Sequence, residues 1–203
     1  MKYYAEFETD KYIIEKYFSN KKDGIMVEVG AAMPESLSMS KAFKEIGWRI
    51  ICVEPNPHYA NLHRKAGNEI YEVALSYKEA ENIEFDIYTS PAQEIDEGMS
   101  YSAIRGKTIV PGYLIPFKKT ISVKVTTLNK ILEWSKVDLL DFVSIDVEGW
   151  EIEVMKGFDT KKYNPLIILL ENMNHSDFYN NYMKSIGYNL VHNIDYNFIY
   201  KKI

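Results

Sequence analysis

The stretch SIDVEGWEIEVMKG, residues 144–157, joins an apolar strand pattern to a helix pattern through two acids. Residues 142–145 are Phe, Val, Ser and Ile, a composition typical of a short buried strand. The residues after Gly149 have apolar positions at helical spacing. Asp146 and Glu148 therefore stand where a strand ends and a helix begins. Such acids either start the helix, where a negative charge is favourable, or face a ligand.

The same alternation of strand and helix recurs along most of the chain. Strand patterns occur at residues 25–30, 48–56, 69–76, 139–146 and 166–172. Helix patterns occur at residues 10–18, 38–47, 57–66, 128–134, 150–158 and 177–186. This order predicts an α/β fold with a doubly wound, mostly parallel sheet. Residues 188–202 hold two more strand patterns joined around Asn193 to Asp195, which predicts an antiparallel hairpin closing the sheet.

Residues 90–117 interrupt this alternation. The segment is rich in proline and glycine, and strand patterns at 81–90 and 120–128 flank it. We expect a long excursion over the substrate side of the molecule. Its side chains either close over an acceptor or anchor an ordinary surface loop; the candidates are Tyr101, Arg105, Tyr113 and Phe117.

Composition indicates one globular domain spanning residues 1–203, with a helical segment at residues 1–22. The chain of 203 residues is 46% hydrophobic and 26% charged, enough for a single substantial core. A net charge of −5 disfavours a nucleic-acid partner held by phosphate contacts. The longest apolar runs fall short of the ~20 residues of a membrane span, so we expect no membrane partner. The single cysteine, Cys52, and an acidic start without a signal-peptide pattern favour a cytoplasmic location. The oligomeric state is left open.

Polar or acidic residues stand at the ends of the five predicted parallel strands. In a doubly wound sheet, ligands bind beyond these carboxyl ends. The residues are Glu28 and Gly30, Glu54, Ala74 to Ser76, Asp146 and Glu148, and Glu171 and Asn172. Glu54 follows Gly30 by 24 residues, close to the spacing at which an acid binds a ribose. The alternative for Glu54 is a solvated acid at a strand end.

The turn after the first strand argues against a pyrophosphate. It reads GAAMPES, residues 30–36, with one glycine where a dinucleotide fingerprint needs three. Glu28 and Glu35 beside this turn would repel phosphate and suit a cationic ligand. S-adenosylmethionine has a ribose, a sulfonium charge and an amino group, and it has no phosphate. It is therefore the cofactor that these residues favour.

Several stretches together resemble the FkbM family of S-adenosylmethionine-dependent methyltransferases. They are MVEVGAAMPES at 26–36, VEPNP at 53–57, VALS at 73–76, VTTLNKIL at 125–132, SIDVEGWEIEVMKGF at 144–158 and LIILLEN at 166–172. The resemblance runs from about residue 25 to residue 173. It implies a Rossmann-like class I methyltransferase fold, a seven-stranded sheet with a reversed last strand. It also implies O-methylation of a hydroxyl on a sugar, glycan or related natural product.

The resemblance also implies cofactor contacts. Glu28, Gly30 and Ala31 are expected along the methionine part, and Glu54 at the ribose. Pro55 and the Ala74–Leu75 backbone are expected at the adenine, with Ser100 and Ser102 as small polar residues nearby. In its first motif the sequence departs from the family pattern, with Ala32 in place of the usual Asn and Pro34 in place of the second Gly. Asn129 stands where the family often has Asp. Pro34 suits the first turn of a helix.

A hydroxyl that accepts a methyl group must lose its proton to a base as it attacks. Four residues are candidates for this base: Asp146, Glu148, Glu171 and His175. Asp146 is the first choice, because it ends the strand facing the cofactor turn. Glu148 either holds the substrate or simply starts a helix, and His175 is either catalytic or structural. If a divalent metal such as Mg²⁺ takes part, Asp146 and Glu171 are its expected ligands, with Glu148 able to share it.

Two other functions stay open at this point. One is a nucleotide-dependent oxidoreductase with an unusual Rossmann turn. The other is a non-catalytic module that keeps the methyltransferase fold for partner binding, which the altered AAMP at residues 31–34 allows.

Overall fold

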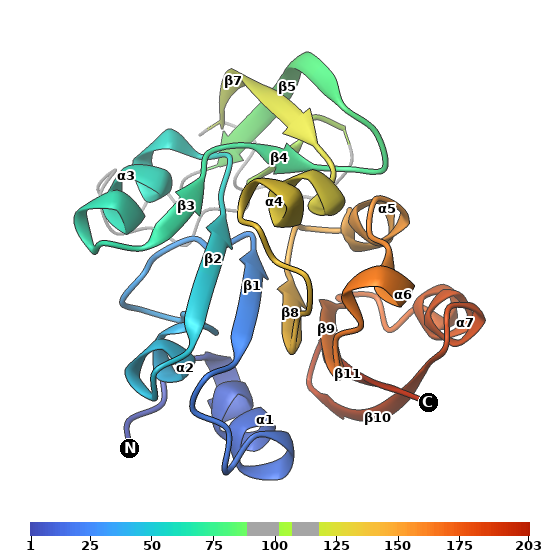
Figure 1. Cartoon of the computed structure of the whole chain (residues 1–203). Coiled ribbons are helices and arrows are strands. Elements are labelled where there is room, and N and C mark those ends of the chain that lie inside the picture. Colours follow the sequence, from blue (N-terminus) through green and yellow to red (C-terminus); the bar gives the residue numbers. More distant parts are fainter. Residues whose placement is uncertain (89–101, 107–117) are drawn as a thin grey trace.

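A seven-stranded mixed sheet forms the centre of the molecule in the computed structural model, which describes residues 1–88, 102–106 and 118–203 (Figure 1). The strand order is β10-β11-β9-β8-β1-β2-β3. The bounds are β1 (Ile25–Val29), β2 (Arg49–Val53), β3 (Glu69–Tyr71), β8 (Phe142–Ile145), β9 (Ile167–Glu171), β10 (Tyr188–Ile194) and β11 (Asn197–Lys202). The five neighbouring strands β3, β2, β1, β8 and β9 run parallel to one another. Strand β11 is antiparallel to both of its neighbours, β9 and β10. The expected α/β sheet and its terminal hairpin are thereby confirmed, with the turn at Asp195 and Tyr196.

Helices cover both faces of this sheet. Their bounds are η1 (Glu6–Glu8), α1 (Thr9–Tyr17), α2 (Lys41–Glu45), α3 (Pro57–Lys65), α4 (Leu128–Trp134), α5 (Glu151–Lys156), α6 (Thr160–Tyr163) and α7 (Asp177–Ser185). Figure 1 shows α1 and α2 near the N-terminus, and α4 to α7 grouped on the other side of the strands. The expected N-cap of α4 is present, since Thr127 Oγ1 accepts a hydrogen bond from Lys130 N.

The strand residues alternate between two apolar cores. On β1, Met26 packs with the α1 and α2 side, whereas Val27 packs with the α4 to α7 side. The same alternation puts Ile167 and Ile168 of β9 in opposite cores. Successive side chains of a strand point to opposite faces, so continuous apolar runs are required where both faces are covered. This is why the strands of the sheet read as apolar and the acids collect at their ends.

A second sheet lies beyond the carboxyl ends of β1 and β2 (Figure 1). It has four strands in the order β4-β7-β5-β6. Their bounds are β4 (Ala74–Leu75), β5 (Ala80–Tyr88), β6 (Ser102–Ile104) and β7 (Lys118–Thr126). The prediction of one strand over 69–76 was wrong, because β3 ends at Tyr71. Glu72 then pairs with Arg64 at 2.6 Å, and the chain joins the second sheet at Ala74.

Other boundaries also differ from the sequence prediction. Residues 31–40 form a loop, and α2 begins only at Lys41, whose N–H donates to Ser38 Oγ at 3.2 Å. Pro34 therefore does not start a helix. The short helix α6, capped by Asp159, was not predicted. Of the excursion at 90–117, the structure describes Ser102 to Gly106, whereas Ser100, Tyr101, Tyr113 and Phe117 lie outside the described residues.

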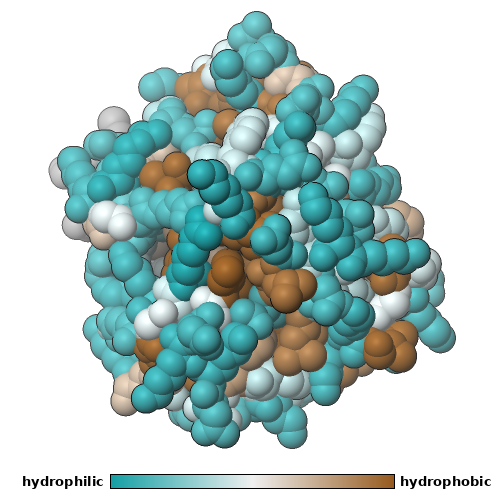
Figure 2. Space-filling view, in the orientation of Figure 1, coloured by the Kyte–Doolittle hydropathy of each residue, from teal (hydrophilic) through white to brown (hydrophobic). Residues whose placement is uncertain are grey.

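The surface has no extended apolar face on the side drawn in Figure 2. Hydrophilic side chains cover most of that face, and hydrophobic atoms form smaller patches between them. Within the described part of the chain, no helix combines the length and apolar character that crossing a membrane requires.

Gly30 provides a test of this fold. Its φ is +78°, and a Cβ there would lie 1.7 Å from the Asp146 carbonyl oxygen. We expect Gly30→Ala to lower the free energy of unfolding by more than about 3 kcal/mol, because a backbone clash adds to the left-handed strain. Urea denaturation measures this change.

Gly67→Ala is the matched control. Gly67 has φ +68° with open space around it, so only the backbone cost of about 1–2 kcal/mol is expected. Equal losses for the two variants would contradict the close packing of Gly30 on Asp146.

Candidate active site

Gly30 and Asp146 bring the ends of β1 and β8 into direct contact. The Asp146 N–H donates to Val29 O at 3.0 Å, and Gly30 lies against the Asp146 carbonyl. Gly30 N also donates to Val53 O at 2.9 Å, which joins the turn to β2. The first turn of the sheet and the acid at 146 therefore occupy adjacent positions at one edge.

Two adjoining cavities open at this edge. The smaller, about 100 Å³, is lined by Val29, Gly30, Ala32, Val53, Glu54, Pro55, Tyr59, Val73, Ala74, Leu75, Phe85, Ser102, Ile104, Asp146, Val147, Glu148 and Trp150. The larger, about 340 Å³, is lined by Ala5, Glu6, Glu28, Val29, Gly30, Ala31, Ala32, Met33, Ser36, Leu37, Met39, Tyr59, Ser144, Asp146, Glu148, Leu169, Glu171, Met173, Tyr196 and Asn197. The residues that line both cavities are Val29, Gly30, Ala32, Tyr59, Asp146 and Glu148. They form one elongated site that passes over the turn after β1.

The turn after β1 is held by two buried side chains. Glu54 Oε2 accepts from Ala32 N at 3.0 Å, and Glu54 Oε1 accepts from Asn56 N at 2.7 Å. His63 is completely buried, with Nε2 at 3.1 Å from Ala32 O. Its Nδ1 lies 2.9 Å from Asn68 Nδ2, so Nδ1 accepts and Nε2 carries the hydrogen. Ala32 keeps φ +41°, a left-handed conformation that asparagine adopts more readily than alanine.

Glu28 supports the loop that follows this turn. Its Oε1 accepts from Met39 N at 2.8 Å and Ser40 N at 3.3 Å, and Ser40 Oγ donates to its Oε2. Burial raises the pKa of Glu28 to about 7, although these hydrogen bonds oppose the shift. Glu28 lines the larger cavity, but both of its carboxyl oxygens are already bound to the loop. Its main observed contribution is to the shape of the site.

Glu151 performs the same task for the loop after β8. Its Oε1 accepts from Val147 N and Gly149 N, each at 3.0 Å, and Tyr179 OH donates to its Oε2 at 2.5 Å. Glu151 is completely buried, and this desolvation raises its pKa. The bonds hold Glu148 at φ +58°, with its side chain lining both cavities. Glu148 lies before α5, whose first residue is Glu151, so the acid within the helix is Glu151.

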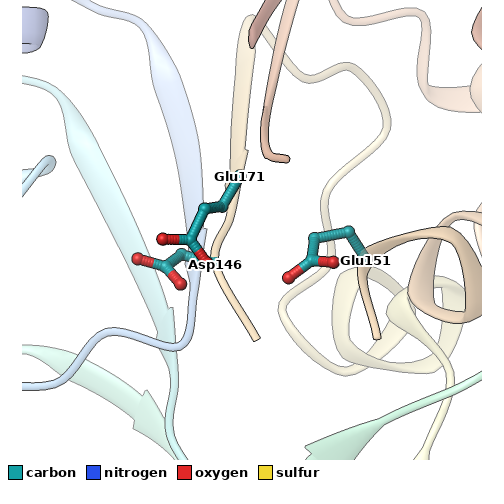
Figure 3. Close-up of side chains that lie close together, drawn as sticks. All are labelled: Asp146, Glu151 and Glu171. Carbon is teal, nitrogen blue, oxygen red and sulfur yellow. The ribbon is translucent and has the colours of Figure 1, made fainter. Parts of the chain in front are cut away.

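Asp146 and Glu171 form a pair of carboxyl groups at the centre of the site (Figure 3). Asp146 is exposed to the cavities, yet protein atoms surround its carboxyl group. The resulting desolvation raises the pKa of Asp146. Desolvation also raises the pKa of Glu171, and the charges of Asp146 and Glu148 raise it further. A hydrogen bond between the two carboxyls lowers the pKa of Asp146 and raises that of Glu171. The hydrogen bond therefore favours the proton on Glu171 and the negative charge on Asp146.

Three carboxylates approach one another closely enough to be considered as metal ligands. One oxygen each of Asp146, Glu151 and Glu171 lies within 4.8 Å of the others. Figure 3 shows Asp146 and Glu171 side by side, with Glu151 reaching toward them from α5. The oxygens of Glu151 are already bound to two amides and a phenol. Within the described residues, Asp146 and Glu171 remain with oxygens free of such bonds. One or two carboxylates with several waters are enough for Mg²⁺, so this geometry allows either a shared proton or a metal ion.

The smaller cavity is a slot with mostly apolar lining residues and several polar ones, among them Glu54, Ser102 and Asp146. Trp150 Nε1 donates to Ser76 Oγ at 3.2 Å, which fixes the indole at the wall. Phe85 and Ile104 reach the slot from the second sheet. The Ser102 Oγ is buried without a hydrogen-bond partner in the described part of the chain. Apolar walls with few fixed polar groups are typical of sites that bind a flat heterocycle.

Most of the sequence-predicted site residues meet in these cavities. Those lining one or both are Glu28, Gly30, Ala31, Glu54, Pro55, Ala74, Leu75, Ser102, Asp146, Glu148 and Glu171. The geometry does not support the expectation for His175, which is exposed, packs edge-on against Phe198 and lines neither cavity. Arg105 pairs with Glu84 at 2.8 Å and also lines neither cavity. Ser100 lies outside the described residues.

Sequence reasoning missed several residues of the site. Glu151 had a usable signal, because it is the next acid after Glu148 in the stretch at 144–157. His63 is on the buried side of α3, and the sequence does not distinguish it from a surface histidine. Glu6 and Tyr196 meet across 190 residues, through a hydrogen bond from the phenol to the carboxylate. A local sequence pattern cannot predict a contact between residues so far apart in the chain.

Together, fold and site define an α/β domain that binds a ligand at the carboxyl edge of its parallel strands, in a cavity rich in acids. The family model described as "Methyltransferase FkbM domain" matches residues 28–194. The chain thus belongs to the FkbM family of methyltransferases. No curated protein matches the chain. Membership favours methyl transfer over the oxidoreductase that the sequence left open.

Glu54 should make stability depend on pH. Burial raises the pKa of Glu54 to about 7, from the 4.5 of an unperturbed glutamate. Between these values the folded chain binds more protons than the unfolded chain, so the free energy of unfolding falls as pH rises from about 4.5 to about 7. Glu54→Gln should remove part of this slope, on the order of 2–3 kcal/mol over the range.

Urea denaturation of both proteins at several pH values measures the difference. The comparison of the two proteins is necessary because His63 also makes stability depend on pH. Burial lowers the pKa of His63, so below about pH 6.5 it makes the free energy of unfolding rise with pH in both proteins. Parallel stability profiles for the two proteins would contradict the raised pKa of Glu54.

Proposed function

We propose that the protein is an S-adenosylmethionine-dependent O-methyltransferase acting on a hydroxyl of a sugar, glycan or related natural product. The observation that carries the proposal is the elongated site passing over the Gly30 turn. One end has Glu54 and an apolar slot, and the other has the pair of Asp146 and Glu171. The strand order, with an antiparallel β11 between β9 and β10, agrees with a Rossmann-like class I methyltransferase.

The smaller cavity suits the adenosine part of the cofactor. Glu54 lies at the end of β2, where a carboxylate accepts hydrogen bonds from ribose hydroxyls. Trp150 and Leu75 offer apolar contact for adenine, and the free Ser102 Oγ offers it a polar partner. The acids around the Gly30 turn suit a sulfonium and an ammonium group. The residues present therefore fit S-adenosylmethionine.

The chain's own residues supply acid–base chemistry and alignment. When bound, S-adenosylmethionine supplies an electrophilic methyl group. Asp146, charged and open to both cavities, accepts the proton of the acceptor hydroxyl as the oxygen attacks. Glu171 keeps its proton and donates a hydrogen bond to Asp146, which orients that carboxylate. Glu151 fixes the loop around Asp146, so the alignment rests on buried contacts.

Cofactor binding is tested with Glu54→Ala. We expect the affinity for S-adenosylhomocysteine to fall by roughly 10- to 100-fold, because hydrogen bonds to a charged acceptor are lost. Isothermal titration calorimetry measures the change, with His175→Ala as a control of unchanged affinity. No binding of S-adenosylhomocysteine to the wild type would favour the non-catalytic module, and binding of NAD in its place would favour an oxidoreductase.

Turnover is tested with Asp146→Asn. This variant keeps the side-chain size and should keep cofactor affinity, while kcat falls by roughly 10²- to 10⁴-fold through loss of the base. Rates are measured by mass spectrometry on a panel of sugars and natural-product alcohols. A wild-type rate for Asp146→Asn would exclude Asp146 as the base. Loss of wild-type activity after addition of a chelator would show that the reaction requires a metal ion.

A further inference from the structure

The larger cavity, which Glu54 does not line, has an acidic wall. Glu6 reaches it from η1, and Glu171 reaches it from the end of β9. Asp146 lies between this wall and the smaller cavity, since it lines both. The remaining contacts there are Tyr196, Asn197 and the exposed Met173. This wall is the acceptor side of the site in the proposed function.

Basic side chains are absent from the described lining of both cavities. Within the described part of the chain, neither Glu6, Asp146 nor Glu171 lies in an ion pair. Acids elsewhere on the molecule do have such partners, for example Glu69 with Arg49 at 3.0 Å. The absence of basic partners is therefore a property of this wall rather than of the chain as a whole.

Two of these carboxyl groups have an oxygen available to a ligand. Glu171 is 7% exposed, yet its Oε2 has no hydrogen-bond partner in the described part of the chain. Leaving a buried polar atom unpaired costs about 1–3 kcal/mol, so such an atom at a cavity wall indicates a missing partner. Glu6 receives the Tyr196 hydroxyl on Oε2, and no hydrogen bond within the described residues reaches its Oε1.

The cofactor alone does not neutralise this wall. S-adenosylmethionine carries a sulfonium, an ammonium and a carboxylate, a net charge of about +1 at pH 7. That charge balances Asp146, beside the turn that the cofactor crosses. Glu6 is left without a positive partner, and Glu171 without a donor for Oε2. A positively charged donor on the acceptor satisfies both.

We propose that the acceptor carries a protonated amine next to the hydroxyl that is methylated, as in an amino sugar, and that Glu6 and Glu171 bind its ammonium group. This inference rests on the proposed function. The Glu6 carboxylate stabilises the ammonium by its charge, and Glu171 Oε2 accepts a hydrogen bond from it. The ammonium keeps its proton and is not the nucleophile. The hydroxyl oxygen forms the new bond to the methyl group, the bond from that methyl to sulfur breaks, and the hydroxyl proton passes to Asp146.

The proposal is tested by comparing three sugars that differ in charge. Methyl glucosaminide is cationic, its N-acetyl counterpart is neutral and methyl glucuronide is anionic. Each is titrated calorimetrically into the complex of the full chain with S-adenosylhomocysteine at pH 7. We expect the cationic sugar to bind at least tenfold more tightly than the neutral one, and the anionic sugar not to bind.

Glu6→Gln should reduce the preference for the cationic sugar by about tenfold while leaving the affinity for S-adenosylhomocysteine unchanged. Glu8→Gln is the matched control, because Glu8 lies two residues away, pairs with Lys11 and lines neither cavity. It should keep the full preference.

Equal binding of the cationic and neutral sugars, tighter binding of the anionic sugar, or binding of none of the three would overturn the inference. So would an unchanged preference in Glu6→Gln. All four outcomes leave the proposed function standing as long as S-adenosylhomocysteine binds. Failure of S-adenosylhomocysteine to bind at the outset instead removes the proposed function itself.

Discussion

The close approach of Gly30 to the Asp146 carbonyl is the constraint on which the site depends. It lets the turn after β1 cross the end of β8 without an intervening side chain, while both strands stay in register. A cofactor held at this turn is then necessarily adjacent to the acid at 146. Any larger residue at position 30 would separate the two halves of the site as well as strain the backbone.

Acidic side chains serve two different purposes around this contact. Glu28, Glu54 and Glu151 each accept hydrogen bonds from backbone amides of a neighbouring loop. Their carboxylates thus shape the three loops that surround the cavity. Among the residues that the structure describes, no backbone amide donates to Asp146 or Glu171, and their two carboxyl groups contact each other. The acids of this site are therefore partly framework and partly chemistry. Glu54 belongs to both groups, because it holds a loop and also lines the smaller cavity.

The sequence was sufficient for the parallel strands and most helices, because burial on both faces requires apolar runs that periodicity detects. It also indicated the residues at the strand ends, most of which meet in the cavities. It failed for 69–76, where a break of two residues moves the chain into another sheet. It also failed at Pro34, because Ser38 and Glu28 accept hydrogen bonds from backbone amides there and organise a loop instead of a helix. The sequence could not predict the Glu6–Tyr196 contact, because tertiary packing alone brings those residues together.

The position of β11 has a consequence for the order in which the molecule assembles. This strand lies between β9 and β10, so β10 joins the sheet only through its pairing with β11. Glu6 contacts Tyr196 at the turn of that hairpin, across 190 residues. Contacts of such separation close large loops and form slowly. The acidic wall of the cavity should therefore be among the last features to appear during refolding, after the Gly30–Asp146 contact has formed.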